Sequence, residues 1–195
     1  MNKGFGMESP LVSKKIMKKA FGDLELLELE GKFNRMPESV AHSHEHSHTR
    51  TDRIFDFSIE SMKDDPDFTH LFKICQQMIM IPFELNKWHH SLLLQMTDRF
   101  IASYFSGKRD FIKDLQDSGH GSADNGMKTT VLLFIGPVEK KSLMGSIELK
   151  TKDKVEELAI EANQCFVISS RDCAYSIKEV RTQLFMLKML IAGPE

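Results

Sequence analysis

The sequence predicts an α+β protein whose antiparallel β core occupies the last third of the chain, behind a helical first half. Four short apolar runs, rich in Val, Ile, Leu, Phe and Thr, lie between residues 128 and 192 and are separated by polar, charged or Gly/Pro-bearing turns. Runs of this kind are typical of buried strands, and no helical segment between them is long enough to connect parallel neighbours. An antiparallel sandwich or barrel follows. The runs are Thr129–Ile135, Gly145–Leu149, Cys165–Ser169 and Leu184–Ile191.

A first helix is expected over Leu11–Phe21, where apolar residues alternate with lysines. Ser9 can cap this helix, Pro10 can occupy its first position, and Gly22 can end it. Its lysine face is expected to be solvated, with a membrane-seeking basic helix as the alternative. Leucines then alternate with acids over Asp23–Glu30, which favours an edge strand.

A second helix is expected to begin near Asp64–Asp67, because acidic residues stabilise the positive end of a helix dipole, and to end at Pro82. Strands are predicted at Ile54–Ile59 and Phe100–Tyr104. Helices that precede strands suit a fold in which the helices cover one face of a β core. The apolar face of the second helix recurs at steps of three and four residues and comprises Phe68, Leu71, Phe72, Cys75, Met78 and Ile79.

The 195 residues fit a single domain, which we expect to span 11–195 behind a flexible N-terminus at 1–10. A net charge of -2 gives no overall field that would hold nucleic acid or an anionic membrane. The three cysteines have no metal-ligand spacing and are expected to be buried, reduced thiols. No signal peptide and no apolar run of about 18 residues is found, so an intracellular location, cytoplasmic or nuclear, is expected.

A histidine-rich loop at about 35–53 is expected to be mobile, because it holds few apolar residues that could be buried. Its histidines alternate, so an extended chain would place four imidazoles on one side, and imidazole binds zinc, copper or nickel. The favoured interpretation is a flexible linker, with metal binding as the alternative. The histidines are His42, His44, His46 and His48.

The order and spacing of the later segments carry a family resemblance. The matching segments are 102–107, 111–116, 130–135, 145–149, 165–172, 175–180 and 184–190. In this pattern the chain resembles the 2-oxoglutarate- and iron(II)-dependent oxygenases, in particular the hypoxia-type prolyl hydroxylases. The resemblance implies a double-stranded β-helix, a jelly-roll-like and cupin-like core, with N-terminal helices. It also implies iron(II) and 2-oxoglutarate as the cofactors of an active member.

The residues that carry the family's chemistry are replaced in this sequence. The family binds iron through a His-x-Asp pair and a distal histidine, and the resemblance places Asp114, Gln116 and Tyr175 at these positions. It places Phe134 and Leu184 where a tyrosine and an arginine hold oxoglutarate. An acid, an amide and a phenol do not match a two-histidine, one-carboxylate site, and leucine cannot form a bidentate contact with a carboxylate. The site is therefore predicted to be vestigial, with no metal and no cofactor.

The favoured function is a catalytically inactive oxygenase-like domain, a pseudoenzyme that serves as a protein–protein interaction module or complex subunit. Its partners are proteins, a homo-oligomer is possible, and neither nucleic acid nor a membrane is expected. One alternative is an active iron(II)/2-oxoglutarate dioxygenase with rearranged ligands, drawing on His120 and Asp124, although all eight histidines lie at or before His120. A second alternative is a cupin-like binder of a small molecule.

Overall fold

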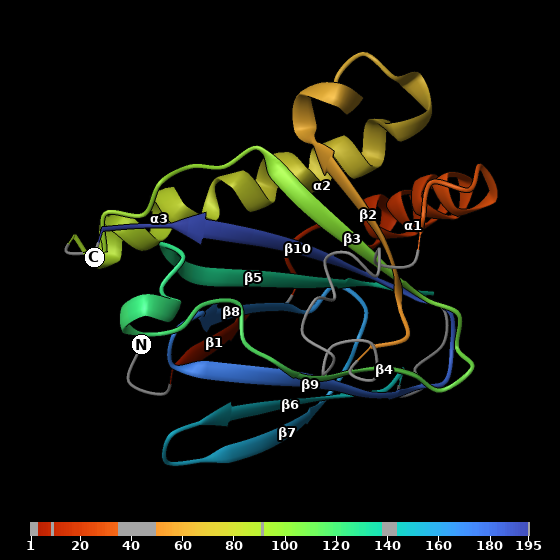
Figure 1. Cartoon of the computed structure of the whole chain (residues 1–195). Coiled ribbons are helices and arrows are strands. Elements are labelled where there is room, and N and C mark those ends of the chain that lie inside the picture. The colour runs from red at the N-terminus through yellow and green to blue at the C-terminus, as the bar shows by residue number, and fades with distance from the viewer. Residues whose placement is uncertain (1–3, 9, 35–49, 91, 138–143, 195) are drawn as a thin grey trace.

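The computed structural model describes residues 4–8, 10–34, 50–90, 92–137 and 144–194. The four alternating histidines of the predicted loop lie outside these ranges. Two antiparallel sheets face one another in the part of the chain that is described (Figure 1). The larger sheet has the order β1 (Phe5–Glu8), β8 (Cys165–Ser169), β5 (Met127–Ile135), β10 (Leu184–Ala192), β3 (Arg99–Phe105) and β2 (Arg53–Ser58).

The smaller sheet completes a double-stranded β-helix. From β3 to β10 the chain passes back and forth between the two sheets, so neighbours in a sheet are mostly distant in sequence. This winding confirms the predicted core, and all four of the expected strand runs are strands. The order of the smaller sheet is β4 (Asp110–Leu115), β9 (Cys173–Val180), β6 (Ser146–Thr151) and β7 (Val155–Ala159).

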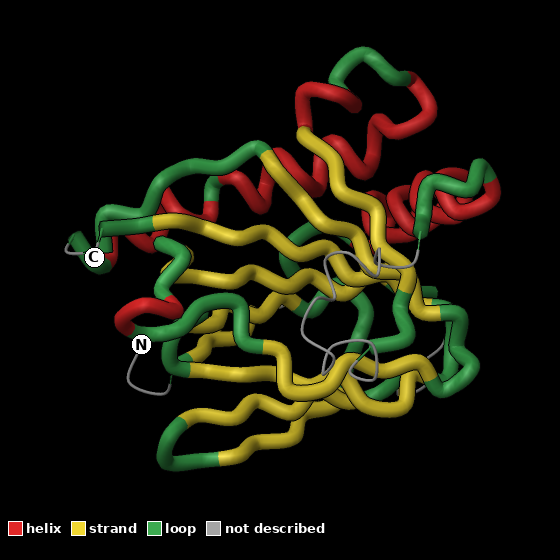
Figure 2. The backbone as a smooth tube through the Cα atoms, in the orientation of Figure 1, coloured by secondary structure: helices red, strands yellow, loops and turns green. Residues whose placement is uncertain are grey.

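The helices lie together over the outer face of the larger sheet (Figure 2). They are α1 (Lys14–Leu29), α2 (Thr69–Ile79) and α3 (Ile81–Trp88), with the short 3-10 turns η1 (Ile59–Met62) and η2 (Pro66–Phe68) beside them. A third 3-10 turn, η3 (Gly121–Ala123), lies apart from the helices, in the connection between β4 and β5. Within the described ranges, no helix combines the length and the apolar character needed to cross a membrane.

Helix α1 differs from its prediction at both ends. Its N-cap is Ser13, whose hydroxyl accepts a hydrogen bond from the Ile16 backbone N–H, rather than Ser9. The helix also continues past Gly22 through the segment expected to be an edge strand. Asp23 explains this, because its carboxylate accepts hydrogen bonds from the backbone N–H groups of His70 and Leu71 at 2.9 and 2.8 Å. It thereby caps the first turn of α2 and fixes the helical continuation of α1 against that helix.

The apolar residues form two separate layers, because successive side chains of a strand point to opposite faces. Eight strand residues from the four predicted runs have no exposed surface and show the division. Val131, Leu133, Leu187 and Met189 pack beneath the helices. The other four fill the space between the two sheets and are Ile147, Leu149, Phe166 and Ile168.

The N-terminal segment is ordered where the sequence suggests a flexible tail. Phe5–Glu8 pairs with β8 at the edge of the larger sheet, in a register that sets Phe5 opposite Ile168. This strand is too short to show a period of its own, so its partner decides its conformation. The three cysteines are buried and free, as expected. Burial raises the pKa of Cys165 to about 12, which keeps this thiol protonated.

Candidate functional site

In the second half of β4, the residues that point into the barrel differ by one position from those that strict alternation would place there. Its pairing with β9 is irregular between Ile112 and Leu115, and Asp114 in this interval has a φ of 46°. An extra residue in one strand moves every following side chain to the opposite face. Leu115 therefore packs against the inner core, while Asp114 and Gln116 are exposed.

The three positions expected to hold metal ligands consequently do not converge. Tyr175 on β9 is buried inside the barrel with 1% of its surface exposed. The Gln116 amide instead donates a hydrogen bond to the Arg171 backbone carbonyl at 2.6 Å, outside the barrel. Asp114 contributes its backbone N–H to the Ser176 hydroxyl, and its side chain faces solvent.

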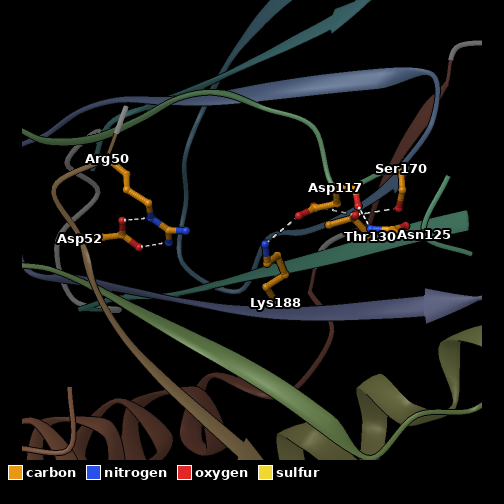
Figure 3. Close-up of polar contacts among 7 residues, drawn as sticks. All are labelled: Arg50, Asp52, Asp117, Asn125, Thr130, Ser170 and Lys188. Atoms are coloured by element: carbon orange, nitrogen blue, oxygen red, sulfur yellow. Dashed lines mark hydrogen bonds and ion pairs between the residues drawn. The ribbon is translucent and has the colours of Figure 1, made fainter. Parts of the chain in front are cut away.

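The acid that does enter the barrel is Asp117, which follows β4 directly. Its side chain is 6% exposed, and both of its carboxylate oxygens are used. Oδ1 lies 2.8 Å from the Lys188 ammonium on β10, and Oδ2 accepts a hydrogen bond from the Thr130 hydroxyl on β5 at 2.8 Å (Figure 3). The Thr130 hydroxyl lies 2.9 Å from that of Ser170, and the Asn125 amide donates to the Asp117 backbone carbonyl.

Lys188 is as deeply placed as its partner, with a side chain 7% exposed. Two opposite charges can be buried only when they compensate one another, because desolvation of either alone costs several kcal/mol. The pair therefore makes the interior electrically neutral at this point. It also connects the end of β4 in the smaller sheet to β10 in the centre of the larger one.

A second buried ion pair lies just before β2, beside the middle of β4. Arg50 donates hydrogen bonds to both oxygens of Asp52 at 2.7 and 2.5 Å, and the Asp52 side chain has no exposed surface. Arg50 forms a β-bridge with Ile112, and Thr51 donates its backbone N–H to the Phe111 carbonyl at 3.0 Å. Residues just before β2 thus extend the edge of β4. Burial lowers the pKa of Arg50, but the hydrogen bonds and charge of Asp52 outweigh burial and raise it.

The Tyr175 hydroxyl is buried without a hydrogen-bond partner in the described part of the chain, and the charges of both ion pairs influence it. Burial raises the pKa of its hydroxyl well above the ordinary value, the negative charge of Asp117 raises it further, and the positive charge of Arg50 opposes the shift. The phenol is therefore neutral at physiological pH. We refer to Arg50, Asp52, Asp117, Tyr175 and Lys188 as the interior polar cluster.

The two vestigial cosubstrate positions form part of the apolar interior. Phe134 and Leu184 have no exposed surface and belong to the core between the sheets. The Phe134 ring packs edge to face against Phe166 with 5.8 Å between their centroids. These two side chains form an apolar wall that offers no donor for a carboxylate.

His120 and Asp124, the alternative ligand pair, have separate partners near the surface. His120 is exposed, with Nε2 3.4 Å from Asp172 Oδ1. Asp124 forms ion pairs with Arg171 and Lys128 and accepts a hydrogen bond from the Gly126 backbone N–H. Among the described residues, no group of three or more His, Cys, Asp or Glu side chains is arranged to hold a metal ion.

Comparison with known proteins assigns the fold. No protein-family model matches the sequence, and no curated protein sequence matches it either. Solved structures match nearly the whole chain, and they place it in the fold of the 2-oxoglutarate- and iron(II)-dependent oxygenases, here represented by prolyl hydroxylases.

Three of these structures illustrate the likeness. A prolyl 4-hydroxylase from Pseudomonas putida has a TM-score of 0.75 at 12% identity, covering 98% of this chain and 94% of that one. A prolyl hydroxylase from Trichoplax adhaerens, solved with a peptide of the hypoxia inducible factor oxygen degradation domain, has a TM-score of 0.80 at 13% identity, covering 97% and 84%. A viral collagen prolyl hydroxylase from Paramecium bursaria Chlorella virus 1 has a TM-score of 0.60 at 8% identity, covering 98% and 97%. At these identities the likeness concerns the fold.

Proposed function

We propose that this chain is a catalytically inactive oxygenase-like domain that acts in the cytoplasm or nucleus as a protein-binding module or complex subunit. The observation that carries the proposal is the ion pair between Asp117 and Lys188. Leu115 pairs with Tyr175 of β9, and this phase of β4 supports assigning Leu115 and Asp117, in place of Asp114 and Gln116, to the family's His-x-Asp positions. On this assignment, Asp117 is the carboxylate that the chain retains at the former metal-binding positions. The Lys188 ammonium already neutralises its charge.

This donor set does not fit iron(II). A non-haem iron centre of this family needs two imidazoles and a carboxylate on one face, with open positions opposite them. Leu115 supplies no ligand atom, and the raised pKa of Tyr175 keeps its phenol protonated. A divalent cation beside Asp117 would also meet the positive charge of Lys188, which lies 2.8 Å from the same carboxylate.

Binding of oxoglutarate is disfavoured for a related reason. A dicarboxylate needs a cation or several hydrogen-bond donors at its far end. Phe134 and Leu184 provide neither at the positions implied by the resemblance, and both are packed within the apolar core. The interior of the barrel is thus occupied by side chains that serve its stability.

The exterior supplies the surfaces that a binding module needs. Apolar side chains project into solvent from the end of α3 and the segment after it, with Trp88 80%, Leu93 63% and Met96 60% exposed. Leu93 adopts a φ of 44°, a strained conformation for leucine, and the neighbouring Leu94 backbone is held by both ends of the Asn86 amide. Exposed aromatic and apolar residues on a fixed backbone suit contact with a protein.

The binding role is tested by affinity capture from native extract, with the bound proteins quantified for wild type and variants. We expect Trp88→Ser together with Leu93→Ser to reduce capture of the specific partner at least several-fold. Leu29→Ser provides a matched control, because Leu29 is also 80% exposed but lies on α1. Partner capture that is unaffected by the double variant, or that depends on added iron(II) and oxoglutarate, would contradict the proposal.

A further inference from the structure

We infer that the Lys188 ammonium is a built-in cation that replaces the metal ion as the counter-charge of Asp117, and that removing this side chain leaves a binding site for a small primary ammonium ion. The inference rests on the proposed absence of a metal site. It assigns a structural role to the ion pair of the interior polar cluster. It also names the class of ligand that the space left by the Lys188 side chain would accept.

Lys188 lies on the face of β10 that points into the barrel. It is the sole charged residue of β10, a strand that otherwise reads as an unbroken apolar run. Leu184 and Met186 share its parity, and both belong to the core between the two sheets. In the central part of the larger sheet it pairs with Leu132 of β5 and Ile101 of β3. An unpaired lysine at such a site would be strongly destabilising.

The contacts of Asp117 show that the ammonium completes its coordination. One carboxylate oxygen is taken by Lys188 and the other by Thr130, whose hydroxyl also contacts Ser170. The two side chains that contact the carboxylate come from β10 and β5, neighbouring strands of the larger sheet. Asp117 follows a strand of the smaller sheet. The contact therefore joins the two sheets through a pair of opposite charges inside the barrel.

The chemistry of the two cations explains why only one can be present. A lysine ammonium is a compact point charge with three donors, and it can satisfy a carboxylate without any second ligand. A divalent ion needs several ligands, which Leu115 and the protonated Tyr175 do not supply. A primary ammonium ion reproduces the charge and the donors of Lys188, so it is the ligand class that the emptied position selects.

A double-mutant cycle on the full chain, followed by thermal unfolding, tests the counter-charge. Lys188→Met retains the length of the side chain but leaves Asp117 buried without a partner. We expect the melting temperature to fall by roughly 6–20 °C, the range for loss of one partner of a buried ion pair in a chain of this size. Adding Asp117→Asn to Lys188→Met should recover much of this loss, because no isolated charge then remains.

The matched control is Lys178→Met, which removes a lysine from a partly exposed ion pair with Glu148 and should change the melting temperature little. A wild-type melting temperature for Lys188→Met would overturn the inference. A double variant that is no more stable than Lys188→Met would also overturn the inference. The same holds if neither the single nor the double variant folds.

Chemical rescue tests the ligand class. Methylammonium chloride should raise the melting temperature of Lys188→Ala in a concentration-dependent way, because a ligand that binds the native state stabilises it by mass action. Tetramethylammonium chloride at the same concentration has the charge but no N–H donor, and it should have no comparable effect. Asp117→Asn combined with Lys188→Ala should lose the response. Equal effects of the two salts on Lys188→Ala would overturn the cation-site part of the inference.

Failure of this inference and failure of the proposed function give different experimental results. Iron-dependent turnover by the wild-type chain would contradict the pseudoenzyme proposal, whatever the mutant cycle shows. The opposite result is a wild-type chain that neither binds iron nor turns over oxoglutarate, together with a mutant cycle that shows no coupling between Asp117 and Lys188. That combination would contradict this inference alone.

Discussion

Leu115 of β4 lies opposite Tyr175 of β9 in the smaller sheet. This pairing fixes which side chains of β4 enter the barrel, and it follows from the irregular register around Asp114. An apolar residue and a protonated phenol thus lie side by side inside the barrel. Asp117, two residues after Leu115, is directed to Lys188 instead. The predictions below test the contacts that establish this arrangement.

Asp23→Ala should destabilise the fold by roughly 1–2 kcal/mol, because it removes the side chain that caps the first turn of α2. The loss is measured as the change in the midpoint of denaturant-induced unfolding. Asp23→Asn should retain most of the stability, since its amide oxygen can still accept a hydrogen bond. Equal losses for the alanine and asparagine variants would show that the cap does not act through this oxygen.

Arg50→Ala should destabilise the fold by roughly 3–5 kcal/mol, because it leaves the Asp52 carboxylate buried without its counter-ion. Chemical denaturation provides the measurement. Arg99→Ala is the matched control, since Arg99 contacts both oxygens of an exposed aspartate, Asp56, and such pairs contribute about 0–1 kcal/mol. Similar losses for the two arginine variants would contradict the buried role of Arg50.

Tyr175 should make stability fall at alkaline pH. The pKa of its hydroxyl is raised in the folded state. Its contribution to stability is therefore complete below the unfolded pKa of about 10 and is lost as the pH rises above that value. Tyr175→Phe should reduce the slope of stability against pH above about pH 10. In a Tyr104→Phe background, which leaves Tyr175 as the one tyrosine, tyrosinate absorbance should appear only as the protein unfolds. Ionisation in the folded chain near pH 10 would contradict the burial of Tyr175.

The strand pattern of the sequence predicted the antiparallel core, because burial on both faces of a strand leaves long apolar runs such as Thr129–Ile135. The double-stranded β-helix topology followed from the order and spacing shared with the oxygenases. The same pattern contained a visible sign of the site. Lys188 interrupts the apolar run of β10, and a single charge in a buried strand requires a partner. The interpretation of Asp23–Glu30 as a strand failed because Asp23 is used by a distant helix, which local alternation does not reveal.

The identity of the other site residues could not be derived from the sequence. The alternation of β4 predicts Asp114 and Gln116 on the inner face, and a single irregularity in the strand places Leu115 and Asp117 there instead. No periodicity signals such a bulge in a strand of this length. Arg50 lies at the end of a histidine-rich polar segment, and its pairing with β4 depends on contacts between residues about 60 positions apart.

The most direct test of the central claim is turnover and binding of oxoglutarate by the purified wild-type chain supplied with iron(II), with an active prolyl hydroxylase as the positive control. We expect no decarboxylation of oxoglutarate above the rate without protein, and no rise in melting temperature with iron(II) and oxoglutarate together, because a ligand that does not bind cannot stabilise the folded state. Decarboxylation that requires iron(II) and is abolished by Asp117→Asn would contradict the claim and identify the chain as an active oxygenase.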